Sequence, residues 1–293
     1  MARKKHTNQE QPFLEHLEEL RWRLLYAALY VVLFAVLAFL FRGFIFDQVI
    51  LAPKKPEFLT NQLLCQLGSS TGLSQLCINS NPFNIINIKM AGQFSIHIKV
   101  SLLAGIIVSF PFIIREFWKF VKPALQELEQ RMVTRSIFFS SLLFFAGVLF
   151  GFYVISPLSV NFLGNYSVSA DVTNQINLGS YISTVSAVVL SSAVIFELPV
   201  LIYLLSKAGI VTTDFLKRYR KHAIVLILGL AAIITPPDIF SQVLVCVPLI
   251  VLYEGGIMIA RRIETRDFPA PETYEENEET DEAEESDHNQ PEA

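Results

Sequence analysis

The chain has 293 residues, of which 52% are hydrophobic and only 17% are charged, and phenylalanine alone contributes 24. About a quarter of the residues of a typical soluble domain are charged, so this composition argues against an ordinary soluble enzyme. Two uncharged runs, 24–41 and 136–160, contain 18 and 25 residues. Apolar runs of this length form membrane-spanning helices. We therefore predict an all-α integral membrane protein.

Six membrane-spanning helices fit the distribution of apolar residues. In chain order they are predicted at residues 24–46, 94–114, 136–160, 182–205, 223–234 and 240–260. The fifth has only 12 uncharged residues, which would cover about 18 Å of a hydrocarbon core roughly 30 Å thick. We expect that this helix is packed away from lipid, that the bilayer is thin beside it, or that residues 235–237 lie deeper in the membrane than the predicted end of the span.

The placement of lysine and arginine predicts the orientation of these spans. With a cytoplasmic N-terminus, 18 of the 23 cationic side chains lie on the cytoplasmic side. The other side keeps five: Arg42, Lys54, Lys55, Lys89 and Lys99. Because cytoplasmic loops carry the excess of positive charge, both termini are predicted to be cytoplasmic.

Both ends of the chain differ in composition from its middle. We divide the sequence into a flexible N-terminus (1–11), a six-span membrane domain (12–262) and an acidic tail (263–293). Residues 264–293 hold 13 acidic residues and one arginine. Such a segment buries too little apolar surface to offset its chain entropy, so we predict a disordered, solubilising tail. Docking of the tail on a basic partner is the alternative.

Two of the three cysteines lie in the long loop between the first two spans. That loop is on the predicted outer side, where disulfides form and persist. We therefore favour a disulfide between Cys65 and Cys77 over two free thiols. Cys246 lies alone inside the sixth span and is expected to be a packing residue.

Charged side chains inside the membrane are costly and mark functional candidates. Glu197 interrupts the fourth span, and Pro199 should kink the helix there. Glu197 is either protonated and inert, a proton carrier, or bonded to a polar side chain of a partner helix. Lys99 is expected to anchor the outer end of the second span. Glu116 and Glu254 are expected to have boundary roles.

Catalytic motifs are absent from the sequence. It contains no HExxH, GxSxG, CxxC or glycine-rich phosphate loop, and its five histidines are scattered. We therefore predict that the chain is not an enzyme and has no metal, no cofactor and no nucleic-acid partner.

Carboxylates gather beside the membrane on the predicted cytoplasmic side. Residues 12–25 place leucines at helical spacing, which predicts an amphipathic helix running into the first span. In it Glu18 and Glu19 can pair with arginines three or four positions later. The first cytoplasmic loop adds Glu127 and Glu129. A solvated interfacial helix is one interpretation; a surface that binds a cationic peptide through arginine–carboxylate contacts is the other.

Four motifs in this order resemble the TatC family, the multispanning receptor subunit of the twin-arginine protein translocase. The resemblance covers about residues 12–262. It rests on HLEELRWRL (16–24), on FPFIIREFWKFVKPAL (110–125) followed by Glu129, on FELPV (196–200) and on TPPDIFSQ (235–242).

The resemblance implies roles for individual residues. Glu129, together with Glu19 and Arg21, would bind the arginine pair of a signal peptide, and Glu197 would face small single-span subunits of the TatA or TatB type. Further family positions in loops and at span ends are Pro53, Phe94, Lys99, Asp238 and Gln242. Two features depart from the family: Gln130 stands where a basic residue is common, and the loop 53–87 is longer than in many relatives.

The function implied is that of a twin-arginine signal-peptide receptor and core scaffold of the translocase in the cytoplasmic (inner) membrane. It would move folded proteins with the proton-motive force, as a homo-oligomer surrounded by lipid within a larger complex. The alternative is a proton-coupled small-solute secondary transporter with Glu197 as the carrier. Such transporters often have internal repeats with matching broken helices, and the first half of this chain has no counterpart of the short fifth and sixth spans.

Overall fold

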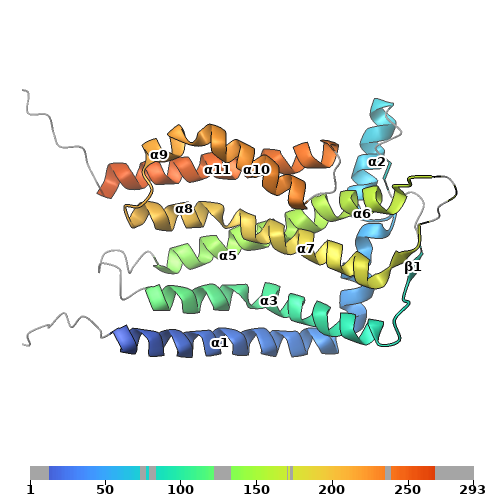
Figure 1. Cartoon of the computed structure of the whole chain (residues 1–293), viewed down its shortest axis with the longest axis horizontal. Coiled ribbons are helices and arrows are strands. Elements are labelled where there is room, and N and C mark those ends of the chain that lie inside the picture. Colours follow the sequence, from blue (N-terminus) through green and yellow to red (C-terminus); the bar gives the residue numbers. More distant parts are fainter. Residues whose placement is uncertain are drawn as a thin grey trace, which may run out of the picture.

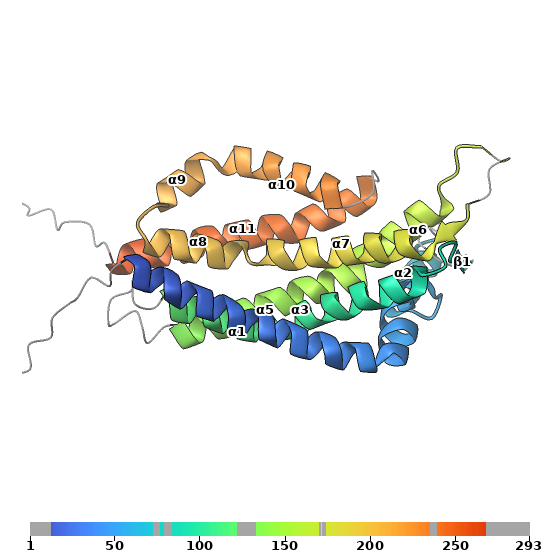
Figure 2. The ribbon, with the colours of Figure 1, turned by 60° about the horizontal axis from the view of Figure 1, so that its bottom comes forward.

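The computed structural model describes residues 13–72, 77–78, 84–121, 133–169, 171, 174–234 and 239–267. Its long helices run along a common axis and form one layered bundle (Figure 1 and Figure 2). The first turn of α1 and the last turn of α11 lie at the same end of this bundle in both views. We call this the network end and the opposite end, which carries α2 and β1, the disulfide end.

The first two long helices, α1 (Phe13–Leu40) and α3 (Gly92–Val121), pack along each other. An added Cβ on Gly105 would lie 2.7 Å from backbone atoms of Val31 and Ala35. A glycine at this point therefore lets the helices approach closely, as small residues do between membrane helices. Towards the disulfide end, the ring of His97 stacks on Phe39 with centroids 3.9 Å apart. Its Nε2 also hydrogen-bonds the Phe39 carbonyl oxygen at 3.1 Å.

The segment between α1 and α3 is largely structured at the disulfide end. It forms a π-helical segment η1 (Phe44–Ile50), a 3₁₀ turn η2 (Ala52–Lys54) and the helix α2 (Leu59–Thr71). A disulfide joins Cys65 in α2 to Cys77. Strand β1 (Ile85–Ile86) then pairs in parallel with β2 (Ile176–Asn177), with Ile85 opposite Ile176. The loop predicted at 53–87 thus contains an additional helix.

The middle of the bundle consists of two helical segments that are each interrupted once. The first comprises α5 (Val133–Phe150), the π-helical η5 (Gly151–Ile155) and α6 (Ser156–Asn165). The second comprises α7 (Leu178–Phe196) and α8 (Leu198–Lys207). Glu197 occupies the turn between α7 and α8, and Pro199 lies in the first turn of α8, where a missing backbone N–H is tolerated.

Glycines bring α5 and α7 together. An added Cβ on Gly147 would lie 2.8 Å from Ala193 Cα and 2.9 Å from Ser192 O. One turn later, a Cβ on Gly151 would lie 2.9 Å from the Ser192 side chain. This small-residue contact holds the two interrupted segments at short range.

The last part of the chain forms α9 (Thr213–Arg218), α10 (Arg220–Ile234) and α11 (Ile239–Asp267). Buried side chains of α8, α10 and α11 form a common core that includes Ile202, Ala231 and Leu249. Helix α11 continues to Asp267, past the predicted tail boundary at 263, because its turns keep packing on α8 and α9. The predicted regions 1–11 and 268–293 lie outside the described residues.

Among the described residues, five helices are long and apolar enough to span a membrane. They are Leu17–Leu40, Gly92–Val121, Ser136–Asn165, Leu178–Lys207 and Gln242–Thr265. These match five of the six predicted spans. The remaining one is the fifth predicted span, at 223–234, and it corresponds to the 15-residue α10. The length of α10, about 22 Å, is less than the hydrocarbon thickness. As a membrane span, α10 stays a prediction.

Candidate functional site

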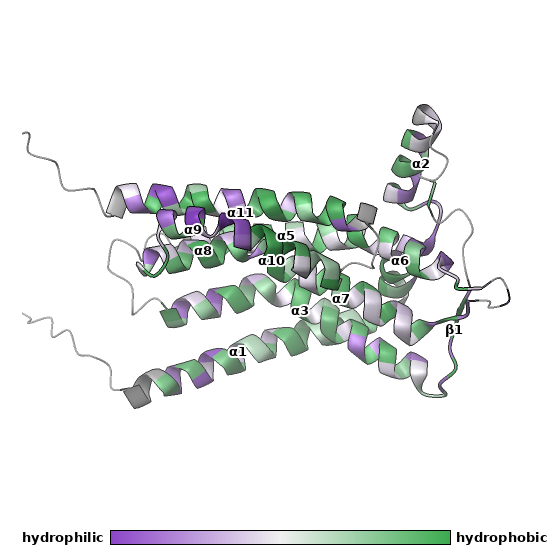
Figure 3. Ribbon diagram, turned by 45° about the horizontal axis from the view of Figure 1, so that its top comes forward, coloured by the Kyte–Doolittle hydropathy of each residue, from purple (hydrophilic) through white to green (hydrophobic). Residues whose placement is uncertain are grey.

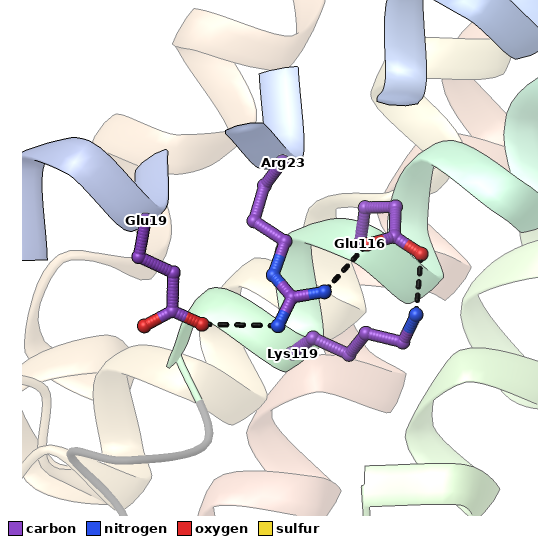
Figure 4. A network of polar contacts seen from close by, with 4 residues as sticks. All are labelled: Glu19, Arg23, Glu116 and Lys119. Carbon is purple, nitrogen blue, oxygen red and sulfur yellow. Dashed lines mark hydrogen bonds and ion pairs between the residues drawn. The ribbon is translucent and has the colours of Figure 1, made fainter. Parts of the chain in front are cut away.

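A four-residue ionic network joins α1 to α3 at the network end (Figure 4). Arg23 donates from Nη2 to Glu19 Oε1 at 3.0 Å and from Nη1 to Glu116 Oε2 at 3.1 Å. Lys119 donates from Nζ to the other oxygen of Glu116 at 2.6 Å. Both oxygens of Glu116 therefore accept charge-assisted hydrogen bonds, the stronger class of hydrogen bond in proteins.

The members of this network differ in burial. The side chain of Glu116 is only 4% exposed, whereas Glu19, Arg23 and Lys119 are each partly exposed. A buried carboxylate is tolerated when it is paired and fully hydrogen-bonded, which is the case here. Glu116 thus forms the buried centre of the network, and Glu19, Arg23 and Lys119 form its partly exposed rim.

Helical spacing explains how the network forms. Glu19 and Arg23 are four residues apart on α1, and Glu116 and Lys119 are three apart on α3, so each pair shares a helix face. The contact between Arg23 and Glu116 then ties the two helices together. Arg21 is exposed. At two residues from Arg23 it lies on roughly the opposite side of α1.

Sequence reasoning found only part of this network. It predicted that Glu18 or Glu19 pairs with an arginine three or four positions later, and the structure pairs Glu19 with Arg23. It assigned Glu116 a boundary role and missed the contact with Arg23, 93 residues away in the chain. The spacing of Glu116 and Lys119 was a signal for their own pair, but no sequence signal pointed to the contact with Arg23.

Residues 122–132 lie outside the described residues. They include two of the predicted loop carboxylates, Glu127 and Glu129. Of the predicted binding carboxylates, the structure therefore describes the position of Glu19 but not that of Glu129.

Glu197 forms a second polar position, inside the bundle. Its Oε2 accepts a hydrogen bond of 2.8 Å from Ser140 Oγ on α5. Its Oε1 is buried and has no hydrogen-bond partner among the described residues. A buried polar atom without a partner is costly.

The remaining predicted positions do not gather around the network. Pro53 is buried in η2, and its carbonyl oxygen accepts a hydrogen bond of 3.1 Å from Asn61. Phe94 and Lys99 are exposed near the start of α3, about 20 residues and thus roughly 30 Å from Glu116. The side-chain amide of Gln242 donates to Leu228 O on α10 at 3.4 Å. Asp238 lies outside the described residues.

A large, mostly apolar cavity of about 890 Å³ lies towards the disulfide end. Side chains of α1, α3, α5 and α7 line it, among them Phe34, Val108, Val148 and Val189. Its lining suits an acyl chain or an apolar peptide segment. The described residues contain no cluster of side chains with the composition of a metal site.

The helices, the apolar surface and the internal carboxylate define a polytopic α-helical membrane protein with a charged surface at one end. Comparison with protein families is specific: the family described as Sec-independent protein translocase protein (TatC) matches residues 15–248. The chain belongs to the TatC family, as its four motifs indicated. Membership of a translocase family, rather than of an enzyme family, agrees with the predicted lack of enzymatic activity, and a solute transporter finds no support.

Individual relatives are similar over most of their length. TatC of Blattabacterium sp. subsp. Periplaneta americana is 36% identical over 258 residues, which are 87% of this chain and 97% of that protein. TatC of Campylobacter jejuni is 32% identical over 90% of this chain and 97% of its own. A crystal structure described as the twin arginine translocase receptor TatC is 31% identical, with a TM-score of 0.63. The alignment covers 84% of this chain and 98% of that one.

Proposed function

We propose that this chain is a twin-arginine signal-peptide receptor and the core scaffold of a translocase for folded proteins. Solved relatives are described as receptors of this system. The observation that carries the proposal is the partly exposed Glu19 carboxylate, which Arg23 holds in place at the rim of the network. Its second oxygen receives no hydrogen bond from any described residue and is available to an incoming guanidinium.

Arginine suits this surface better than lysine does. A guanidinium donates two parallel hydrogen bonds to a carboxylate, whereas an ammonium acts as a point charge. In the proposed complex, Glu19 and Glu129 hold the arginine pair of the signal peptide, and Arg21, on the other side of α1, contacts another part of the peptide. The apolar part of the signal peptide would then enter the bundle, where the apolar cavity offers a compatible surface.

The proposed setting is the cytoplasmic (inner) membrane, with six spans and both ends of the chain in the cytoplasm. The bias of 18 of the 23 cationic residues towards that side supports this orientation. In it, α10 forms the fifth span, the network end faces the cytoplasm and the disulfide end faces the oxidising compartment. The proton-motive force would drive transport.

The proposed partners are small single-span subunits of the TatA or TatB type, and further copies of this chain within a larger complex. A polar side chain on a partner helix would pair with Glu197 Oε1, which lacks a donor among the described residues. An interhelical bond of this kind is worth about 1–2 kcal/mol in lipid.

The receptor function predicts that a Glu129→Ala variant binds a twin-arginine peptide at least about tenfold more weakly, because a hydrogen bond to a charged group contributes roughly 1.5–3 kcal/mol. Affinity is measured with the full-length protein in lipid nanodiscs and a fluorescently labelled signal peptide. Gln126→Ala, three positions earlier in the same loop and without a charge, is the matched control and should bind normally.

Two results of that experiment would count against the proposal. A peptide with both arginines replaced that binds the wild-type protein equally well would remove the receptor function itself. Unchanged affinity of the Glu129→Ala variant for the intact peptide would remove Glu129 from the site and leave Glu19 to be tested in the same way.

The partner site predicts that Glu197→Ala lowers photocrosslinking between α7 or α8 and a single-span subunit, since the partner's polar group loses its acceptor. Ser140→Ala is the control, because it removes the internal hydrogen bond but keeps the carboxylate. Crosslinking is quantified in membranes that contain both proteins. Equal crosslinking of Glu197→Ala and wild type would place the partner elsewhere.

A further inference from the structure

Helix α2 carries an unpartnered row of leucines. Leu59, Leu63 and Leu67 are 58%, 51% and 56% exposed. Their spacing of four residues puts them along one face of the helix. Such a row on a helix outside the spans needs an explanation, because water is a poor environment for three adjacent leucines.

One face beside the leucine row is polar, whereas Leu64 and Cys65 on the other side are partly buried. Gln62 and Ser69 are exposed about 100–120° around the helix from Leu63, Gln66 borders the leucine row, and Asn61 is buried against the protein. The 13 residues of α2 include no charged side chain. An amphipathic helix of this kind suits the boundary between water and lipid, where its apolar face enters the membrane.

The orientation of α2 fits that boundary. It projects sideways from the disulfide end of the bundle, nearly perpendicular to the long helices, in the views of both Figure 1 and Figure 3. Because the long helices cross the membrane, a helix perpendicular to them runs parallel to the membrane surface.

The first turn of α2 is fixed to the rest of the protein, and its middle is tied to the segment that follows it. Just before its first turn, the ring of Phe58 stacks on Tyr153 with centroids 5.3 Å apart. The hydroxyl of Thr60 donates to Tyr153 O, and Asn61 donates to Lys55 O at 2.8 Å. At its middle, a disulfide joins Cys65 to Cys77. The leucine row is therefore held in one orientation.

That orientation continues the lipid-facing surface of the first span. Leu59 lines the apolar cavity together with Phe41 and Phe44. Both phenylalanines are themselves exposed at the end of that span. The leucine row therefore begins at this apolar surface and extends it along the membrane plane. Lys54 and Lys55 precede the helix, at a level where cations can contact lipid phosphates.

We propose that α2 is an interfacial membrane anchor: its leucine face lies among the lipid headgroups and upper acyl chains of the leaflet at the disulfide end. The partner of this surface is the lipid bilayer itself. The anchor fixes the depth of the disulfide end in the membrane. It acts independently of signal-peptide binding.

Quenching of tryptophan fluorescence by brominated lipids tests this placement. Leu67→Trp is compared with Ser69→Trp, which lies on the opposite side of α2, in full-length protein reconstituted into nanodiscs. The two native tryptophans are first replaced (Trp22→Phe and Trp118→Phe). We expect a blue-shifted emission and strong quenching for Leu67→Trp, and emission typical of water with little quenching for Ser69→Trp.

Leu63→Trp provides the same measurement should Leu67→Trp fail to accumulate, and it should behave like Leu67→Trp. Soluble iodide should give the reverse order of quenching. Equal, weak lipid quenching at positions 67 and 69 would overturn the proposal and assign the leucine row to a protein partner. Strong quenching of both would also overturn it, because α2 would then be immersed without a defined face.

Discussion

Replacing Glu116 by alanine is expected to lower the free energy of unfolding by about 2 kcal/mol and to weaken binding of twin-arginine peptides. Removing one partner of a buried ion pair costs about 3–5 kcal/mol. The cost should be smaller here because Arg23 and Lys119 are partly exposed and can be hydrated. Peptide binding suffers because Arg23 no longer holds α1, and with it Glu19, at a fixed distance from α3.

Two variants separate this effect from a general loss of charge. Glu116→Gln keeps the shape and still accepts hydrogen bonds, so its thermal midpoint should fall less. Glu19→Ala removes an exposed pair within one helix, worth roughly 0.3–0.5 kcal/mol, and should reduce peptide binding with little change in stability. Midpoints are read from intrinsic fluorescence in detergent. If Glu116→Ala melts no earlier than Glu19→Ala, the buried pair does not hold the two helices.

The second large effect is expected at Gly147. A Cβ there would lie 2.8 Å from Ala193 Cα and Phe196 Cβ and 2.9 Å from Ser192 O, and the backbone atoms among these cannot move aside. Gly147→Ala should therefore destabilise the protein by about 3 kcal/mol, the upper end of typical overpacking costs. By separating α5 from α7, it should also draw Ser140 away from Glu197.

Gly229→Ala is the matched control for this prediction. It lies within α10 and its added Cβ would meet nothing within 4 Å. Alanine favours a helix over glycine by roughly 1 kcal/mol, so this variant should be as stable as the wild type or slightly more so. The thermal midpoint should fall below that of the wild type for Gly147→Ala and stay equal or rise for Gly229→Ala. A Gly147→Ala variant that is no less stable would show that the α5–α7 contact is looser than described.

Hydropathy predicted most of the bundle, because long apolar runs have few alternatives to a membrane helix. The extension of α3 beyond residue 114 was missed because Arg115, Glu116 and Lys119 interrupt the apolar run. The helix continues because Glu116 pairs with Lys119 on the same helix and with Arg23 on α1. Sequence spacing reveals the first of these pairs but not the second, which depends on tertiary packing.

Helix α2 was missed for a different reason. It lies in a loop that hydropathy marks as polar, although Leu59, Leu63 and Leu67 already have helical spacing in the sequence. The family resemblance covered the motifs of the membrane domain and gave no information on this longer loop. Local periodicity was therefore the available signal for α2, as it had been for the amphipathic start of α1.

The contacts between α1 and α3 use unlike chemistry at their two ends. Arg23 and Glu116 form an ion pair at the network end, whereas His97 stacks on Phe39 near the disulfide end. Dissolved salt screens partly exposed charges much more than it affects ring stacking. Rising ionic strength therefore weakens the α1–α3 contact mainly at the network end, where Glu19, Arg23 and Lys119 are partly exposed. The stacked rings near the disulfide end keep the register of the two helices.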